Sequence, residues 1–432
     1  MSSEWRRLGD HCLKIGSGAT PKGGKDAYLE SGPFTLIRSQ NIYNDGFKPA
    51  GLAFISEDQA KKLNGVAVEA GDVLLNITGD SVARVCLAQS QFLPARVNQH
   101  VAIIRPNPEV FDSRFLRYFL ASPYQQDLML GLAAAGATRN ALTKVMIENF
   151  KVPCPPIEVQ KASADVLSAL DDRISLLRET NATLEAIAQA LFKSWFVDFD
   201  PVRAKMEGRV PEGMDEATAA LFPDALVESE LGLVPEGWTT SPIYDMATFI
   251  NGAAYKAFEP NAEQRGRPII KIAELKSGVT AQTAYSDVEM PEKYLIETGD
   301  ILFSWSGNPD TSIDTFVWTF EPAWLNQHIF RVLPHANHER TFVLQMLRHL
   351  KPVFTELARN KQTTGLGHVT VADMKRELIA MPSAALVEQF DLTVRPIHAR
   401  IFENQRQAKS LATLRDTLLP RLISGQLQIA EG

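Results

Sequence analysis

Apolar residues recur at every third or fourth position along two long stretches of the chain. The first stretch has the seam residues Leu167, Leu170, Ile174, Leu177, Asn181, Leu184, Ala188, Leu191 and Trp195. The second has Phe390, Val394, Ile397, Ile401, Asn404, Ala408, Leu411, Arg415, Leu418 and Leu422. This spacing is typical of a helix that packs along its length against another helix. Each seam includes one asparagine, and a buried asparagine usually fixes the register and the partner of such a pair.

Two residues disturb the second seam. Pro396 lacks a backbone N–H, so we expect either a bend there or a helix that starts near it. Arg415 stands at a seam position, where we expect its side chain to reach solvent or to pair with an acidic residue.

The chain is also similar to itself at an offset of about 228 residues. Residues 69–75 reappear as residues 297–303, and Asn98-Gln99-His100 reappears as Asn326-Gln327-His328. The two helical seams align as well, at nearly the same offset. Matches in the same order predict a duplicated architecture with a pseudo-two-fold repeat. The two long helices are then best paired antiparallel within one chain.

Each half predicts the same order of elements. A β-like segment that begins at a tryptophan (residues 5–15 and 238–250) is followed by a loop that contains glycine. Short apolar runs predict strands over residues 34–38, 73–77 and 101–104, and over residues 268–272, 301–304 and 329–333. Amphipathic segments predict helices over residues 114–120 and 342–350. Each block is therefore expected to be an α+β domain with a twisted, partly antiparallel sheet.

These patterns divide the chain into five parts. We expect one block over residues 1–152, a long helix within 153–199, a second block over 237–381 and a second long helix within 382–427. Residues 200–236 contain four prolines and many acidic residues, so they are expected to be a linker with a short helix near residues 216–221.

The net charge of −7 argues at first against nucleic acid as a partner. However, residues 1–150 have a net charge of +2 and residues 151–237 a net charge of −8. The acidity therefore lies in the first long helix and the segment after it, and the blocks can carry local basic faces. Three distant cysteines and the absence of a signal peptide or membrane-spanning run favour a reducing cytoplasm.

Motifs of catalysis are missing from the sequence. The nearest approach to a phosphate-binding loop, residues 18–25, has Ala19 in place of the first glycine and Asp26 after the lysine, so a flexible loop is expected there. No complete motif of a methyltransferase, nuclease, hydrolase or zinc enzyme appears, and the histidines show no metal spacing. The chain is expected to be non-catalytic.

Hydrogen-bonding side chains gather instead in the loops of both halves. Such side chains read base edges and hold phosphates in protein–DNA complexes. The candidates in the first half are Thr20, Lys22, Lys25, Arg38, Ser39, Gln40, Asn41, Asn76, Thr78, Ser81, Arg84, Thr138 and Arg139. The candidates in the second half are Lys256, Lys271, Lys276, Ser304, Trp305, Ser306, Asn308, Lys361, Thr364 and His368. A helix over residues 167–195 is roughly 43 Å long, enough to hold two DNA-reading blocks about 34–36 Å apart, one turn of duplex.

Three segments carry a resemblance to a known family. They are residues 191–205 (Leu-Phe-Lys-Ser-Trp-Phe-Val-Asp-Phe-Asp-Pro-Val-Arg-Ala-Lys), residues 221–238 with Leu221-Phe222-Pro223 and Pro235-Glu236-Gly237-Trp238, and residues 414–425. Together with the repeat, which covers nearly the whole chain, they resemble the specificity subunit of Type I restriction–modification systems.

The resemblance implies two tandem target-recognition domains, separated by two long helices that form an antiparallel intrachain coiled coil. Each domain would read one half of an asymmetric, bipartite double-stranded DNA site. The helices would space the domains and dock two modification subunits, which use S-adenosylmethionine to methylate adenine at N6. Restriction subunits would add cleavage that depends on ATP and Mg. The chain itself would hold no cofactor and no metal.

Two other functions stay open on the sequence. The chain could be a coiled-coil scaffold that assembles protein partners without touching DNA, or a stand-alone enzyme. DNA binding that weakens steeply as salt rises would distinguish a DNA-reading subunit from the scaffold. A stand-alone enzyme would require activity of the purified chain with S-adenosylmethionine or ATP.

Overall fold

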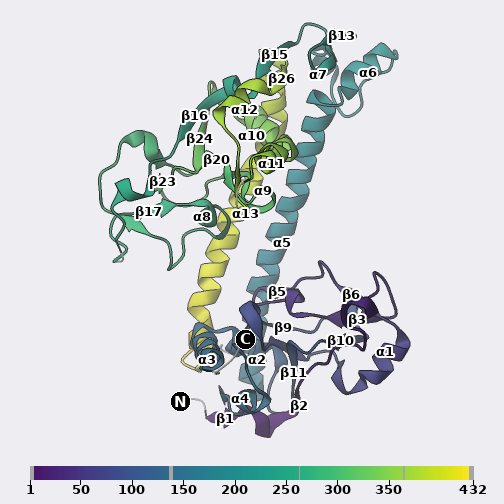
Figure 1. Ribbon diagram of the computed structural model, residues 1–432, viewed down its shortest axis with the longest axis vertical. Coiled ribbons are helices and arrows are strands. Elements are labelled where there is room, and N and C mark those ends of the chain that lie inside the picture. The colour runs from purple at the N-terminus through teal and green to yellow at the C-terminus, as the bar shows by residue number, and fades with distance from the viewer. Residues whose placement is uncertain (1–3, 136–139, 262, 363–364, 428–432) are drawn as a thin grey trace. The chain divides into compact units, whose positions relative to one another are not determined.

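The computed structural model describes residues 4–135, 140–261, 263–362 and 365–427. The chain forms two compact units (Figure 1). Unit 1 contains the chain up to Leu176 together with the chain from Ala408 onward, and unit 2 is Leu177–Gln407. The two long helices, α5 (Ile157–Phe196) and α13 (Ala384–Ile423), each contribute to both units. Among the described helices, none has the length and apolarity of a membrane span.

Unit 1 contains two four-stranded sheets. The first has the order β2 (Cys12–Ser17), β11 (Val101–Pro106), β8 (Val73–Asn76), β9 (Val85–Leu87), and is antiparallel throughout. The second has the order β6 (Ala53–Ile55), β3 (Phe34–Ile37), β10 (Ala95–Val97), β7 (Ala67–Val68), and its β3–β10 pair is parallel. The continuous apolar runs are explained by burial on both faces of the first sheet. Along β11, Val101 and Ile103 enter one hydrophobic cluster, and Ala102 and Ile104 enter another.

Unit 2 repeats this topology. One sheet has the order β16 (Ala247–Asn251), β24 (Ile329–Pro334), β20 (Ile301–Ser304), β22 (Asp314–Val317). The other has the order β18 (Tyr285–Ser286), β17 (Arg267–Ile270), β23 (Ala323–Leu325), β19 (Leu295–Ile296), again with one parallel pair, β17–β23. Strands β20, β23 and β24 begin 228 residues after β8, β10 and β11. The predicted duplication and the α+β class are therefore confirmed.

A strand pair joins the start of each block to its end. In unit 1, β1 (Trp5–Arg7) pairs antiparallel with β12 (Lys151–Pro153). In unit 2, β15 (Thr239–Pro242) pairs with β26 (Leu378–Met381) in the same way. The polypeptide thus closes each block on itself immediately before it enters a long helix.

Helices cover the first sheet of each unit. The predicted amphipathic segments form α2 (Ser113–Ala121) and α10 (Arg340–His349), one or two residues longer than expected at most ends. The remaining helices of the blocks are α1 (Glu57–Lys62), α3 (Pro123–Ala134) and α4 (Lys144–Glu148) in unit 1, and α8 (Ile272–Ser277), α9 (Pro309–Ser312), α11 (Lys351–Asn360) and α12 (Val371–Arg376) in unit 2.

The two long helices pair antiparallel within each unit, as predicted. In unit 2, the Asn181 amide donates to the backbone oxygen of Ile401 (3.1 Å) and accepts from the amide of Asn404 (2.9 Å). The two seam asparagines are therefore partners, which fixes the register, while the buried Oδ1 of Asn404 has no partner among the described residues. In unit 1, Arg415 pairs with Asp171 at 2.7 Å, which confirms the expected acidic partner of this seam arginine.

The expectation of a helix that starts near Pro396 is wrong. Helix α13 begins at Ala384 and continues through Pro396 without interruption. Pro396 is exposed, and buried residues on both sides of it, Val394 and Ile401, hold the helix against its neighbours. The expected bend at Pro396 stays a prediction.

The connecting segment is more ordered than a linker. Besides the predicted short helix α7 (Glu216–Ala220), it contains α6 (Asp200–Met206) and a hairpin of β13 (Leu226–Ser229) and β14 (Gly232–Pro235). Its residues Val202, Phe222 and Val234 are buried in the same cluster as the second block. The prolines and acidic residues in the sequence gave no indication of this apolar face. The prediction of a linker was therefore wrong, because the segment packs against the second block.

Candidate nucleic-acid interface

A polar hollow of about 650 Å³ lies in unit 1, near the carboxyl end of β8. It brings together five of the candidate residues, Ser39, Gln40, Thr78, Ser81 and Arg84. Tyr43, Gly79, Asp80, His100 and Asn140 complete its lining. Residues from four separate segments of the chain therefore converge on one concave surface. No cluster of His, Cys, Asp or Glu within the described ranges could hold a metal ion.

Two side chains in the hollow are held in place by their neighbours. The Thr78 hydroxyl lies 2.5 Å from Nδ1 of His100, and the amide of Gln99 lies 3.0 Å from Nε2 of the same ring. The Arg84 guanidinium lies over the Tyr43 ring, 4.6 Å from its centroid. Stacking on an aromatic ring fixes the plane of the guanidinium while its N–H groups can still donate. An arginine held in this way is suited to bidentate recognition of a guanine edge or a phosphate.

Two candidates in this half are structural residues. The Asn41 amide donates to the backbone oxygens of Lys48 (2.9 Å) and Ala50 (3.2 Å), and the side chain is fully buried. The Asn76 amide, also fully buried, donates to the backbone oxygen of Ser39 at 2.8 Å. Predicting DNA contact for these two was therefore wrong, because their hydrogen bonds hold the loops that form the hollow.

The other candidates of unit 1 lie outside the lining. Thr20 is exposed and contacts the side chain of Gln99, while Lys22 and Lys25 are exposed near the short 3-10 helix η2 (Gly24–Ala27). Arg38 lies over the Tyr28 ring (5.3 Å to the centroid) and donates to the backbone oxygen of Gly51. Thr138 and Arg139 lie outside the described residues.

The corresponding region of unit 2 lies at the end of β20. Ser306 pairs with His368 across the short strands β21 (Ser306–Gly307) and β25 (Gly367–His368), as Thr78 bridges to Ala141 in unit 1. The indole N–H of Trp305 donates to Asn251 (3.0 Å), and its ring lies 5.7 Å from that of His328. His368 is exposed beside this pair.

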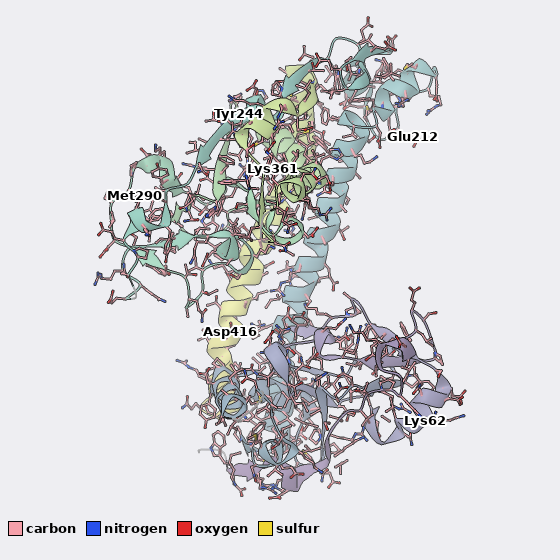
Figure 2. All side chains as sticks on the ribbon, viewed as in Figure 1. Lys62, Glu212, Tyr244, Met290, Lys361 and Asp416 are labelled. Carbon is pink, nitrogen blue, oxygen red and sulfur yellow. The ribbon has the colours of Figure 1, made fainter. Side chains whose placement is uncertain are left out.

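Several candidates of unit 2 have structural partners. Ser304 is fully buried in β20, and its hydroxyl has no partner among the described residues. Asn308 caps α9, because its side chain accepts from the N–H groups of Asp310 (3.0 Å) and Thr311 (3.2 Å). Lys361, labelled in Figure 2, lies 2.5 Å from the buried carboxylate of Asp373. Burial acts to raise the pKa of Asp373, but Lys361 and Thr370 together lower it to about 2. Predicting DNA contact for Ser304 was wrong because the side chain is fully buried, whereas DNA contact by Asn308 and Lys361 stays a prediction.

The remaining lysines of unit 2 differ in their surroundings. Lys271 lies over the Tyr255 ring, 5.1 Å from the centroid, so it is a counterpart of the Arg38–Tyr28 pair, because Lys271 follows β17 as Arg38 follows β3. Lys276 donates to the backbone oxygen of Thr311, and Lys256 is exposed. Thr364 lies outside the described residues.

Sequence reasoning missed Tyr43, Asp80 and His100 as part of the site. One signal was available for His100, because the Asn-Gln-His triplet recurs in the repeat. No comparable signal marked Tyr43, which reaches the hollow only because the β4 (Ile42–Tyr43) and β5 (Gly46–Phe47) hairpin folds beside β9.

Comparison with known proteins decides the family. The sequence profile of the Type I restriction modification DNA specificity domain matches residues 2–186 and again residues 235–389. The chain belongs to this family. It is 25% identical to the Type I restriction enzyme HindI specificity subunit of Haemophilus influenzae, over 91% of this chain and 94% of that protein. It is also 25% identical to the MjaIX specificity subunit of Methanocaldococcus jannaschii, over 97% of this chain and 92% of that protein.

A solved structure supports the fold. The chain aligns with the Type I restriction–modification S subunit from M. genitalium with a TM-score of 0.54, at 16% identity over 98% of this chain and 96% of that one. The family resemblance stated from the sequence is confirmed.

Each DNA specificity domain is fixed to the long helices by a buried polar cluster. We call each of these polar clusters a hub, and the first hub lies in unit 1. There the Asp171 carboxylate of α5 accepts from Tyr118 (2.7 Å) and Arg415 (2.7 Å) and lies 3.2 Å from Arg117 of α2. Burial acts to raise the pKa of Asp171, but the bonds from Arg415 and Tyr118 lower it overall.

The second hub lies at the equivalent place in unit 2. Gln345 of α10, the counterpart of Arg117, donates to Glu185 of α5 (3.1 Å) and contacts Nε2 of His398 of α13 (2.7 Å). Arg348 pairs with the same Glu185. Burial and then Arg348 lower the pKa of His398 to about 4, so the ring is neutral at pH 7. The carboxylate thus comes from α5 in both hubs. Because α5 aligns with α13 in the repeat, the repeat alone would have placed the carboxylate of the second hub on α13.

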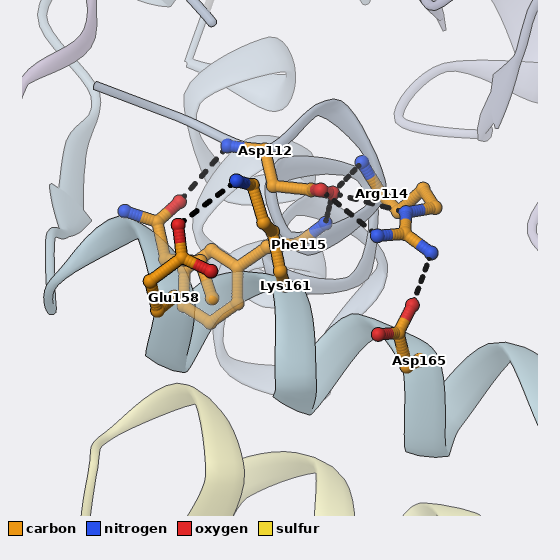
Figure 3. A network of polar contacts seen from close by, with 7 residues as sticks. Asp112, Arg114, Phe115, Glu158, Lys161 and Asp165 are labelled. Atoms are coloured by element: carbon orange, nitrogen blue, oxygen red, sulfur yellow. Dashed lines mark hydrogen bonds and ion pairs between the residues drawn. The ribbon is translucent and has the colours of Figure 1, made fainter. Parts of the chain in front are cut away.

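The first specificity domain has a second polar network at the start of α2 (Figure 3). Asp112 caps the helix by accepting from the N–H groups of Arg114 (2.8 Å) and Phe115 (3.2 Å), and its own N–H donates to Gln160 of α5 (3.0 Å). Arg114 connects Asp112 to Asp165 of α5. These bonds orient α2 on the long helix, and α2 packs against β8 and β9, which border the hollow.

Gly18 lies where the DNA specificity domain permits no side chain. A Cβ at Gly18 would lie 2.1 Å from the backbone oxygen of Asn98 and 2.2 Å from that of Val97. Gly252 meets the backbone of Asn326 and Leu325 equally closely in unit 2. The glycine after β2 therefore serves close backbone packing rather than a phosphate-binding loop.

We predict that Gly18→Ala lowers the free energy of unfolding by about 3 kcal/mol, because the added methyl group must displace backbone atoms. The matched control is Gly16→Ala in the preceding strand β2, where the Cβ meets nothing within 4 Å and a change within about 0.5 kcal/mol is expected. Urea unfolding of the full chain measures both. Equal effects of the two substitutions would contradict the assignment.

Proposed function

We propose that this DNA specificity subunit binds an asymmetric bipartite site in double-stranded DNA, with one half read by each specificity domain. The observation that carries the proposal is the double match of the family profile to two blocks with the same sheet order. Two copies of one reading fold supply two reading surfaces. A dimer of identical domains would read a palindrome, whereas two diverged domains in one chain read unlike half-sites.

Divergence at equivalent positions supports an asymmetric site. The cation that lies over a tyrosine ring immediately after the equivalent strand is Arg38 on Tyr28 in unit 1 and Lys271 on Tyr255 in unit 2. Arginine presents a planar fork that matches a guanine edge, whereas lysine is a point charge. Where Ala141 bridges to Thr78 in unit 1, His368 pairs with Ser306 in unit 2. The two surfaces therefore offer different donors and acceptors.

The partners in this proposal are two modification subunits and the restriction subunits. The modification subunits supply S-adenosylmethionine and methylate adenine at N6, and the restriction subunits supply ATP- and Mg-dependent cleavage, so this chain is non-catalytic and works in the cytoplasm. Exposed leucine and isoleucine side chains on the long helices, Ile187, Leu392 and Leu414, support a docking role for their outer faces. The proposed spacer role of these helices stays a prediction.

The test begins by mapping methylated adenines in the source genome with and without this gene, which yields the site. Binding of the assembled methyltransferase to that site is then measured by electrophoretic shift at two salt concentrations. We expect affinity to fall steeply with salt, by about 10³-fold or more between 50 and 200 mM. A complex that binds no DNA at either salt concentration would leave the protein scaffold as the function.

Arg84→Ala tests the hollow itself. We expect a loss of about 1–3 kcal/mol, or roughly 5- to 150-fold in affinity, for the mapped site, because a fixed guanidinium is removed. The loss for random duplex should be smaller, since a base contact contributes only to the specific complex. Arg6→Ala is the matched control, because Arg6 is an arginine of the same unit that pairs with Glu4 away from the hollow. Equal effects of the two variants would exclude the hollow as a reading surface.

A further inference from the structure

A cavity of about 360 Å³ lies within unit 2, between α10 and the parts of α5 and α13 that belong to this unit. This volume is in the lower part of the range of small-molecule sites, about 300–1,000 Å³. Its apolar wall includes Val317, Leu344, Ile401 and Phe402, and its polar wall is formed mainly by charged side chains. An apolar cavity with a few convergent charged groups is the usual form of a ligand site.

The charges that face the cavity do not balance. Its carboxylates, Glu185 and Asp391, pair with Arg348 and Arg395 respectively, and Asp391 also accepts from the Thr341 hydroxyl. Asp300 nearby is held by Arg331 at 2.8 Å. Each carboxylate around the cavity is thus matched by another arginine.

Arg340 is the additional cation in this group. It donates to the backbone oxygen of Gly299, and none of the carboxylates within the described ranges forms an ion pair with it. Burial lowers its pKa, although Asp300 and Asp391 act in the opposite direction. A guanidinium has five N–H donors in a fixed fork, so a single carbonyl leaves most of them available for an anion.

The first half of the chain shows what normally stands at this place. The counterpart of Arg340, 228 residues earlier, is Asp112, whose carboxylate caps α2 and binds Arg114 (Figure 3). In unit 2 an arginine replaces that carboxylate, and α10 starts without any side-chain cap. Unit 2 therefore has an arginine where unit 1 has a carboxylate, and a cavity lies beside it. The nearby carboxylates of Glu339 and Asp391 accept from the Ala336 N–H and the Thr341 hydroxyl.

We propose that this cavity binds a small organic monoanion, with its carboxylate on Arg340 and its apolar body against Leu344, Ile401 and Phe402. The site goes beyond DNA recognition, because it lies between the specificity domain and the long helices rather than on the reading surface. A ligand there would supply the carboxylate that Asp112 provides in unit 1. Phosphate dianions are less suited, because Glu185 and Asp391 face the same cavity.

The test uses methyl NMR of the full chain with matched pairs of acids and amides: benzoate with benzamide, and phenylacetate with phenylacetamide. We expect each acid to shift the methyl signals of Leu344 and Ile401 in a saturable way at about 1 mM or below, and each amide to bind at least about tenfold more weakly. The methyl signals of Leu36 and Ile104 in unit 1 are the internal control.

Two variants separate anion recognition from a merely apolar cavity. Arg340→Gln should weaken acid binding by about tenfold or more while amide binding changes little. Val317→Phe should block binding of both the acid and the amide, because the larger side chain fills the apolar part of the cavity. This variant tests whether the compounds bind in the cavity if Arg340→Gln fails to fold. Absence of saturable shifts with either acid, equal binding of acids and amides, or unchanged acid binding by Arg340→Gln would each overturn the proposal.

Discussion

Exchanging residues 1–156 for the equivalent block of another member of the family is expected to change one half of the methylated DNA site and to leave the other half unchanged. Block 1 is closed on itself by the β1–β12 pair before α5 begins at Ile157. The new block therefore brings its complete reading surface with it. Each mismatched base pair costs about 1–3 kcal/mol, so a half-site with several changed bases should lose about 10³-fold or more in affinity.

Mapping methylated adenines in cells that carry the exchanged gene measures the outcome directly. The matched control is the reciprocal exchange of residues 237–381, which should change only the other half. A junction after residue 152 or earlier would divide β12 or separate it from β1, whereas a boundary after Pro156 preserves the strand pair. If either exchange changed both halves of the site together, the two domains would not read independently.

The repeat and the helices were predictable because their signals are local and periodic. The seam of apolar residues depends only on the 3.6-residue period of a helix, and it placed one asparagine in each long helix. The structure then makes these two asparagines, Asn181 and Asn404, partners. Strand β20 has the predicted bounds of residues 301–304, because a buried strand is a short apolar run between turn residues. The sequence could not reveal the strand order, since the parallel β3–β10 pair joins segments about 60 residues apart.

The candidate site was predictable as a set of loops but not residue by residue. A polar side chain in a loop looks the same in the sequence whether it faces solvent or a distant backbone oxygen. Asn41 is held by Lys48 and Ala50, and Lys361 by Asp373, and neither pairing has a local pattern. Arg84 differs from them only because the Tyr43 ring supports it from another segment. Function therefore depends on contacts that the fold creates.

Removing the carboxylate of the first hub should be strongly destabilising. Asp171 holds three groups, Arg117, Tyr118 and Arg415, and its side chain is only 22% exposed. Asp171→Ala leaves the buried Arg117 guanidinium without a counter-ion and Arg415 with only the exposed Asp416, which costs about 3 kcal/mol in the free energy of unfolding of unit 1. Asp165→Ala is the matched control on the same helix, because Asp165 pairs with Arg114 but is 65% exposed, and less than about 1 kcal/mol is expected.

Acid should reduce the difference between Asp171→Ala and the parent chain. The folded pKa of Asp171 is lowered, so its contribution is fully present above the unfolded value of about 3.9 and is lost as the pH falls through the folded pKa. Urea unfolding at pH 7 and near pH 3 measures this. Combining Asp171→Ala with Arg415→Ala should cost less than the sum of the single effects, because the two side chains share one ion pair that either change already removes. Additive effects, or a cost equal to that of Asp165→Ala, would show that the hub does not fix α2 to the long helices. The specificity domain would then depend on apolar packing alone for its orientation.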